Sequence, residues 1–166
     1  MAFEIRIRPM ETGDIEEVEA MEHCCFPEPY TAATWRQERQ NTISRTFVAL
    51  PGKDAGGNVL VGYINFWIVI DEAQLHRLAV KEDFRRRGIA AGLIRHMLRY
   101  LSERSVSTVQ LEVRQTNIQA VRLYENFGFV TWGRRRGYYR ETGEDALLLT
   151  GAVNDILNVA EAERGG

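Results

Sequence analysis

The sequence has few of the residues that cross-link a chain or bind metal ions. Its only two cysteines, Cys24 and Cys25, are neighbours, so they cannot join distant parts of a fold. The three histidines show no ligand spacing, and we predict no metal site. The net charge of -2 provides no overall attraction to nucleic acid or to anionic membranes. We therefore expect neither a direct nucleic-acid partner nor a membrane partner.

A long hydrophobic run is also missing. The most apolar stretch, residues 59–70, is too short to cross a bilayer and is interrupted by Gly62 and Asn65. Residues 1–4 contain no basic region followed by an apolar run, so we expect no signal peptide. So few cysteines are typical of a protein in a reducing compartment. These absences predict a cytoplasmic protein.

The composition that remains is that of an ordinary folded domain. With 45% hydrophobic and 27% charged residues, the 166-residue chain can bury a core without metal ions or disulfides. We predict a single domain at residues 1–153, followed by a short helix and a frayed tail at residues 154–166. Acidic residues crowd an early helix at residues 11–22 and arginines occupy residues 134–136, and we interpret both clusters as solvated faces.

Hydrophobic periodicity predicts eleven elements. Strands are expected at residues 3–8, 46–50, 59–70, 74–80, 107–114, 129–132 and 146–150, and helices at residues 12–23, 31–40, 89–104 and 116–127. Thr116 and Gln119 fit a capping box at the start of the last helix, and Gly128 is placed to end it. The resulting order, βααβββαβαββ, indicates an α/β or α+β fold with a mixed sheet and helices on both faces.

The segment between the strand at 74–80 and the helix at 89–104 has the character of an anion-binding turn. It delivers Arg85-Arg86-Arg87-Gly88 to a helix start, where backbone N–H groups lack helical partners and the dipole is positive. Gly88 and the small residues after it, Ala90, Ala91 and Gly92, would let a phosphate approach the backbone. The arginines add donors suited to phosphate oxygens.

This segment resembles the acetyl-CoA signature of the GNAT N-acetyltransferases, through Arg85-x-x-Gly88-x-Ala90 after Leu78-Ala79-Val80. The resemblance implies a GNAT-type mixed, mostly antiparallel central sheet and acetyl-CoA as cosubstrate. It implies that the strand residues Leu78, Ala79 and Val80 pair with the pantetheine arm. The residues implied to hold the pyrophosphate are Arg85, Arg86, Arg87, Gly88, Ile89, Ala90 and Ala91.

A second set of motifs is similar to the bacterial ribosomal-protein-alanine N-acetyltransferase branch of that family (RimI). It comprises Leu111-Glu112-Val113-Arg114, Asn117 and Leu123-Tyr124-Glu125-x-x-Gly128-Phe129. This resemblance implies Glu112 as general base, Tyr124 as general acid and Asn117 as a cofactor contact. It further implies that the partner is a protein N-terminus, the N-terminal alanine of a small-subunit ribosomal protein.

The chain departs from that branch in two segments that would border the acceptor groove. Arg140 follows the paired tyrosines Tyr138 and Tyr139, where relatives have a proline. Pro29-Tyr30-Thr31 stands where relatives have Pro-Trp-Ser. The choice of acceptor is therefore the part of the function that the resemblance fixes least.

The chemistry of amide formation favours an α-amino acceptor. An amine attacks a thioester only when it is unprotonated and must lose a further proton as the bond forms. At pH 7, deprotonation costs about 1 kcal/mol for an α-amino group and about 4.6 kcal/mol for a lysine. A single carboxylate is thus a more suitable base for an N-terminus than for a lysine.

Other interpretations stay open on the residues alone. Glu112 in mid-strand fits a solvated side chain, Tyr124 a core residue with a satisfied hydroxyl, and Asn117 a helix cap. The chain fits an acetyltransferase for lysine or a small-molecule amine, or a non-catalytic acyl-CoA-binding module. A dinucleotide site at Gly88-x-Ala90-x-Gly92 is less consistent, because that motif requires the glycine directly after the strand.

Overall fold

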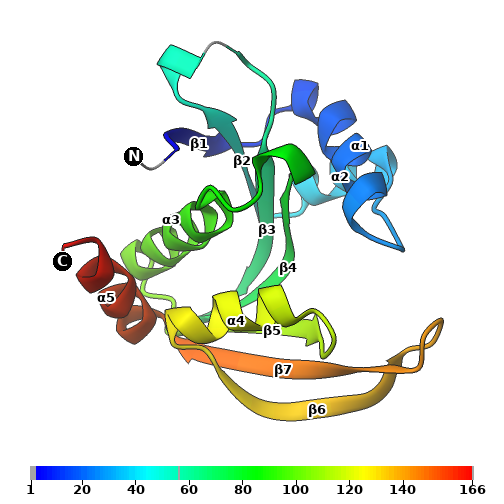
Figure 1. Cartoon of the computed structure of the whole chain (residues 1–166), viewed down its shortest axis with the longest axis vertical. Helices are drawn as coiled ribbons and strands as arrows, with labels where there is room; N and C mark the ends of the chain where they lie inside the picture. Colours follow the sequence, from blue (N-terminus) through cyan, green and yellow to red (C-terminus); the bar gives the residue numbers. More distant parts are fainter. Residues whose placement is uncertain (1–2, 56, 166) are drawn as a thin grey trace. The chain divides into compact units, whose positions relative to one another are not determined.

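A computed structural model describes residues 3–55 and 57–165 of the chain (Figure 1). Its strands and α-helices follow the predicted order βααβββαβαββ, with three short 3-10 helices between them and a final helix in the segment where a short helix was predicted. They are β1 (Ile5–Pro9), η1 (Thr12–Asp14), α1 (Ile15–Cys25), α2 (Ala32–Gln40), β2 (Ser44–Pro51), η2 (Lys53–Ala55), β3 (Gly62–Val69), β4 (Glu72–Val80), η3 (Glu82–Phe84), α3 (Ile89–Glu103), β5 (Thr108–Arg114), α4 (Ile118–Phe127), β6 (Val130–Tyr139), β7 (Glu144–Ala152) and α5 (Val153–Arg164).

The strands form a mixed and mostly antiparallel sheet, as predicted. Their order is β1-β2-β3-β4-β5-β7-β6. The pairs β1/β2, β2/β3, β5/β7 and β6/β7 are antiparallel. β4 and β5 run parallel, with Glu72–Leu75 facing Thr108–Leu111. Leu78, Ala79 and Val80 lie in the part of β4 beyond this paired register.

Contacts divide the chain into two compact units. The first unit contains residues 1–67 and 77–97, and the second contains residues 68–76 and 98–166. The single domain predicted for residues 1–153 stays a prediction. In the described part of the chain, no helix is both long enough and apolar enough to span a membrane.

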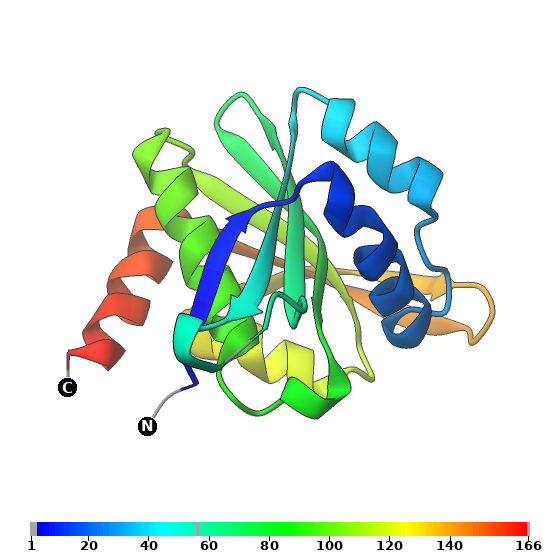
Figure 2. The same cartoon turned by 90° about the horizontal axis from the view of Figure 1, so that it is seen from above.

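In the first unit, α1 and α2 lie on one side of β2 and α3 lies on the other (Figure 2). Val48 belongs to the core that contains α1, α2 and the fully buried Trp35. The next residue back, Phe47, places its ring 4.5 Å from the His96 ring of α3. Because successive side chains of a strand point to opposite faces, helices cover both faces of the sheet in this unit.

In the second unit, α4 and α5 pack beside the β5, β7 and β6 strands. Tyr124 and Phe127 are the buried residues of α4, and Gly128 ends that helix with φ +99°, as predicted. α5 buries Val153, Ile156 and Ala160. α5 begins at Val153 and is a twelve-residue helix up to Arg164, longer than the predicted short helix with a frayed tail.

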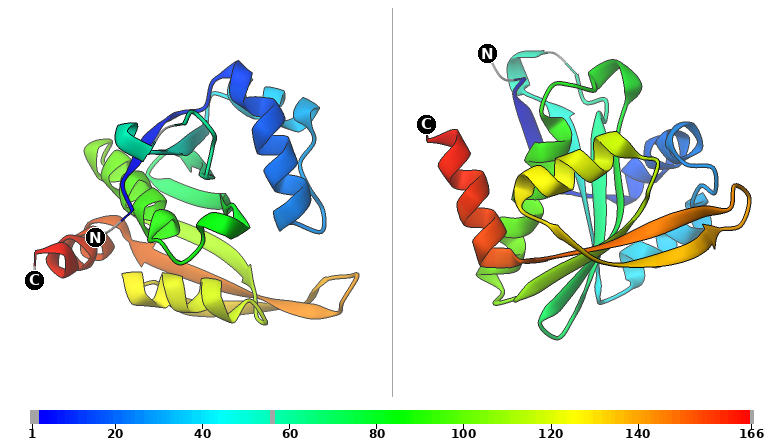
Figure 3. Two further views of the ribbon diagram at one scale, coloured as in Figure 1. Left: turned by 45° about the horizontal axis from the view of Figure 1, so that its top comes forward. Right: turned by 60° about the horizontal axis from the view of Figure 1, so that its bottom comes forward.

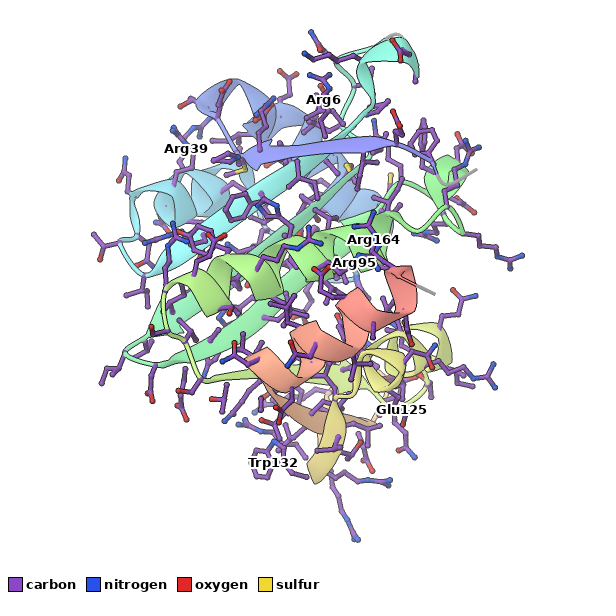
Figure 4. The ribbon with its side chains drawn as sticks, turned by 90° about the vertical axis from the view of Figure 1, so that its left-hand side faces the viewer. Arg6, Arg39, Arg95, Glu125, Trp132 and Arg164 are labelled. Atoms are coloured by element: carbon purple, nitrogen blue, oxygen red, sulfur yellow. The ribbon has the colours of Figure 1, made fainter. Side chains whose placement is uncertain are left out.

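Strands β6 and β7 form a long hairpin, which Figure 3 shows most clearly. β6 reaches Tyr139, well beyond the predicted end at residue 132. It is the last strand of the sheet, and most of its residues are exposed, including Trp132 with 59% exposure (Figure 4). The sequence shows no alternation of apolar and polar residues there because an edge strand with two solvated faces needs none.

The predicted capping box at Thr116 is wrong. The side chain that caps α4 is Asn117, whose Oδ1 accepts a hydrogen bond from the Ala120 N–H at 3.2 Å. Thr116 instead donates its hydroxyl to Glu144 at 3.0 Å. A carboxylate supplied by β7 therefore takes the hydroxyl that the local pattern assigned to the helix.

Candidate active site

The turn before α3 leaves open space over a helix N-terminus. Gly88 has φ +78°, and no atom would lie within 4 Å of a Cβ added there. The first hydrogen bond of the helix runs from the Gly92 N–H to the Gly88 carbonyl at 2.9 Å. The N–H groups just before Gly92 therefore have no partner inside the helix and can bind an anion. The opening and the donors fit a phosphate group.

The three arginines of this turn have different surroundings. Arg85 donates from Nε to the Val80 carbonyl at 3.1 Å and places Nη2 3.7 Å from Cys25 Sγ. Arg87 donates to the Asp83 carbonyl at 3.2 Å and lies over two aromatic rings at 5.3 Å, those of Phe3 and Phe84. Among the described residues, no partner holds the Arg86 side chain, and its φ is +61°. Arg86 is thus the arginine most available to an incoming phosphate.

Strand β4 leads directly into this turn. Ala79 and Val80 are buried, Leu78 is half-buried, and the Lys81 N–H donates to the Val61 carbonyl at 2.9 Å. All three strand residues predicted to contact the pantetheine arm therefore belong to the same unit as the turn. The backbone of an extended strand offers alternating donors and acceptors, which suit an amide-containing ligand arm.

Glu112 lies on the polar face of β5, between the buried Leu111 and Val113. Its side chain is 33% exposed, and its Oε1 lies 3.3 Å from Nη2 of Arg135. The hydroxyl of Tyr138 hydrogen-bonds the same carboxylate, and the negative charge of Glu112 raises the pKa of Tyr138 above its usual value. Glu112 is therefore an accessible carboxylate that is held by two side chains and open to solvent.

Tyr124 occupies a different environment in the same unit. Its side chain is buried in α4, and its ring meets the Phe129 ring edge-on at 5.5 Å. Burial raises the pKa of Tyr124 well above its ordinary value, so the phenol stays protonated. Within the described chain, no group hydrogen-bonds this hydroxyl, and no direct contact joins Tyr124 to Glu112. The proton of Tyr124 is thus available to a ligand.

Asn117 begins α4 in the second unit, away in sequence from the anion-binding turn. Its Oδ1 is the helix cap described above, and the residue is exposed. The capping role that the sequence left open for Asn117 is therefore present. A role in cofactor binding stays a prediction.

A series of ion pairs and aromatic contacts continues from Glu112 along the β6–β7 hairpin. Tyr138 and Tyr139 meet edge-on at 5.1 Å, and the Arg114 guanidinium lies 3.7 Å from the Tyr139 ring centroid. Arg114 in turn binds Glu144 at 2.9 Å and Glu141 at 2.5 Å. Both tyrosines are therefore fixed from the side of β5, next to the Glu112 carboxylate.

Two features, one in each unit, were missed by sequence reasoning. Arg135 was assigned to a solvated face, although it pairs with Glu112. Glu22 was assigned to an exposed acidic cluster, although it is fully buried. The spacing of Glu22 four residues after Val18 and next to Met21, both core residues, was the signal that could have placed it on the buried face.

The described residues contain no group of three or more histidine, cysteine or acidic side chains arranged to hold a metal ion. The first unit provides a phosphate-binding turn and an extended strand. The second unit provides a carboxylate and a protonated phenol.

Comparisons with known proteins agree with this description. The model of the acetyltransferase (GNAT) family matches residues 15–129. The Escherichia coli (strain K12) ribosomal protein bS18-alanine N-acetyltransferase is 30% identical over 145 residues, which are 86% of this chain and 94% of that protein.

Two solved structures extend the comparison to the fold. The crystal structure of the ribosomal-protein-S18-alanine N-acetyltransferase from Escherichia coli matches with a TM-score of 0.81 and 28% identity, covering 90% of this chain and 94% of that one. Arabidopsis thaliana NAA60, in complex with a bisubstrate analogue, matches with a TM-score of 0.81 and 25% identity, covering 90% and 98%.

Proposed function

This chain belongs to the acetyltransferase (GNAT) family, and from that membership we propose that it transfers the acetyl group of acetyl-CoA to the N-terminal α-amino group of a protein. The acceptor we propose is the N-terminal alanine of a small-subunit ribosomal protein, which would place the enzyme in the cytoplasm. The names of the Escherichia coli relatives support this acceptor. The observation that carries the proposal is the accessible Glu112 carboxylate in the middle of β5.

The donor half of the reaction would use the first unit. The pyrophosphate of acetyl-CoA would lie over the N–H groups at residues 87–91, with Arg86 beside it. The open space at Gly88 supports this placement, because no described atom of the chain would lie within 4 Å of a Cβ there. The pantetheine arm would extend along Leu78–Val80, where the strand is beyond its register with β5.

The two groups proposed for proton transfer, Glu112 and Tyr124, belong to the second unit. The amine nitrogen attacks the thioester carbonyl, a C–N bond forms, and Glu112 takes the proton that the nitrogen loses, directly or through water. The C–S bond then breaks, and Tyr124 gives its proton to the departing thiolate. A carboxylate open to solvent can return its proton to water, and a phenol with a raised pKa is protonated at pH 7, as a general acid must be.

The experiment that tests the acceptor class compares amines under one set of conditions. The protein is incubated with acetyl-CoA and with N-terminal peptides, N-terminally blocked lysine peptides or polyamines, and kcat/KM is measured for each. We expect the peptide with an N-terminal alanine to have the highest value. A higher value for a lysine peptide or a polyamine would show that the acceptor class is wrong.

A further inference from the structure

A fully buried carboxylate lies at the end of α1, outside the groups used above. Glu22 has no solvent exposure. Its Oε1 accepts a hydrogen bond from the Tyr63 hydroxyl at 2.7 Å, and its Oε2 accepts one from the Tyr30 N–H at 2.8 Å. The Arg77 Nε completes the set with an ion pair at 3.3 Å. Two hydrogen bonds and one ion pair, from three different segments, therefore meet on one carboxylate.

Arg77 also contacts the segment that contains Tyr30. Its guanidinium lies 4.0 Å from the Tyr30 ring centroid and 4.5 Å from that of Phe26. Its Nη2 also donates to the Glu28 carbonyl at 3.3 Å. The loop between α1 and α2, residues 26–30, is thus held by its backbone and by both of its aromatic rings.

This arrangement is costly as a device for stability alone. Removing a carboxylate and a guanidinium from water carries a penalty that their attraction often fails to exceed, so an apolar replacement would serve a core equally well. What a buried carboxylate with two hydrogen bonds and an ion pair does provide is a defined position for the groups around it. The group positioned here is the loop at residues 26–30.

The position of Arg77 in β4 relates this loop to the proposed reaction. Arg77 immediately precedes Leu78–Val80, and the anion-binding turn follows them. A pantetheine arm that starts at the turn and extends back along β4 passes Val80, Ala79 and Leu78 in that order. Its thioester end therefore lies toward Arg77, and the loop at residues 26–30 packs on Arg77.

We propose that Glu22 and Arg77 are positioning residues that hold the loop at residues 26–30 in place to receive the first residues of the acceptor. This proposal rests on the proposed function. The half-buried rings of Phe26 and Tyr30 form an apolar surface, which suits a small uncharged first side chain such as alanine. Glu22 also neutralises Arg77, whose charge would otherwise repel an acceptor that arrives as an ammonium group.

The test replaces Glu22 with glutamine and uses Asp14→Asn as its matched control. Asp14 is also a poorly exposed acid next to α1 and pairs with Arg8 at 2.6 Å, but it makes no contact with the loop. We expect Glu22→Gln to raise the acceptor KM about tenfold, because a small displacement of a positioning surface is enough for that. Acetyl-CoA affinity should stay within about twofold. Asp14→Asn should lower the melting temperature without changing the acceptor KM.

A second measurement does not depend on activity. The Tyr30 N–H donates to Glu22. The hydrogen exchange of this N–H should therefore be faster in Glu22→Gln than in the wild type and unchanged in Asp14→Asn. If Glu22→Gln does not fold, Arg77→Lys replaces it, since lysine keeps the charge but loses the planar contact with both rings.

The outcomes separate this inference from the proposed function. An unchanged acceptor KM, or equal changes in both variants, would overturn the positioning role while N-terminal acetylation by the wild type stands. If the wild type acetylates no N-terminal peptide, the proposed function fails. In that case, an unchanged hydrogen-exchange rate of the Tyr30 N–H in Glu22→Gln would independently reject the role of Glu22 in holding the loop.

Discussion

The Glu112 carboxylate and the Arg135 guanidinium meet at 3.3 Å although strand β7 separates the strands that carry them. Glu112 faces Leu148 of β7, and Arg135 faces Ala146 of the same strand. The two β7 positions are two residues apart and so lie on one face of the sheet. The small side chain of Ala146 leaves room for the long arginine to reach across.

This ion pair should contribute little to stability. Both side chains are partly solvated, at 33% and 55% exposure, and such pairs contribute less than about 1 kcal/mol. We expect a double-mutant cycle of Glu112→Gln and Arg135→Gln to give a coupling energy below about 1 kcal/mol in urea unfolding. A larger coupling would indicate that the pair is part of the structural framework of this unit.

The same carboxylate should nevertheless be essential for turnover. Glu112→Gln keeps the shape of the side chain but removes its basicity, and kcat should fall by about 10²–10⁴ at pH 7. The loss should become smaller as rising pH supplies unprotonated amine. Glu125→Gln, on the exposed side of α4, is the matched control and should keep its activity (Figure 4). Near-normal turnover of Glu112→Gln would return Glu112 to a purely structural role.

Gly88→Glu should abolish measurable acetyl-CoA binding in calorimetry. The new side chain would occupy the open space over the helix start and bring a negative charge against the pyrophosphate. A non-glycine residue at positive φ also costs about 1 kcal/mol of stability. Gly143→Glu controls for that strain, because Gly143 has φ +71° and equally open surroundings outside the turn. Equal acetyl-CoA affinity in a folded Gly88→Glu variant would reject the assignment.

Tyr124→Phe separates catalysis from packing because it removes only the hydroxyl. With no protein group bonded to that hydroxyl, the melting temperature should stay close to that of the wild type. Turnover should fall about tenfold to a hundredfold, less than at Glu112, because a thiolate is already a good leaving group. An acyl donor with a more acidic thiol should recover much of the loss. A variant that is less stable but fully active would show that the acid lies elsewhere.

Stability should decrease in alkali because of the buried phenol of Tyr63. Burial, with the adjacent charge of Glu22, raises the pKa of Tyr63 far above its usual value. Below about pH 10 the phenol is protonated in both states, and above it only the unfolded state ionises, so rising pH then favours unfolding. In urea titrations, the free energy of unfolding of Tyr63→Phe should fall less between pH 10 and 11 than that of the wild type, by about 1 kcal/mol. An equal decrease in the free energy of unfolding with pH in the wild type and in Tyr63→Phe would contradict this prediction.

The sequence by itself determined the features that depend on near neighbours along the chain. Gly88 and the small residues after it indicated a turn with open space, because backbone torsion and the helix start are local properties. Gly128 ended α4 as predicted for the same reason. The hydrophobic periods gave the element order, since each helix or strand must bury one face.

Only the tertiary structure decided which distant side chains meet. Arg135 and Arg77, the ion-pair partners of Glu112 and Glu22, come from strands that lie far away in the sequence. The cap of α4 is Asn117, whereas the Thr116 hydroxyl donates to Glu144 of β7, a partner distant in sequence. A local sequence pattern indicates which donors and acceptors are present. The fold determines the distances between them, and hydrogen bonds and ion pairs depend on those distances.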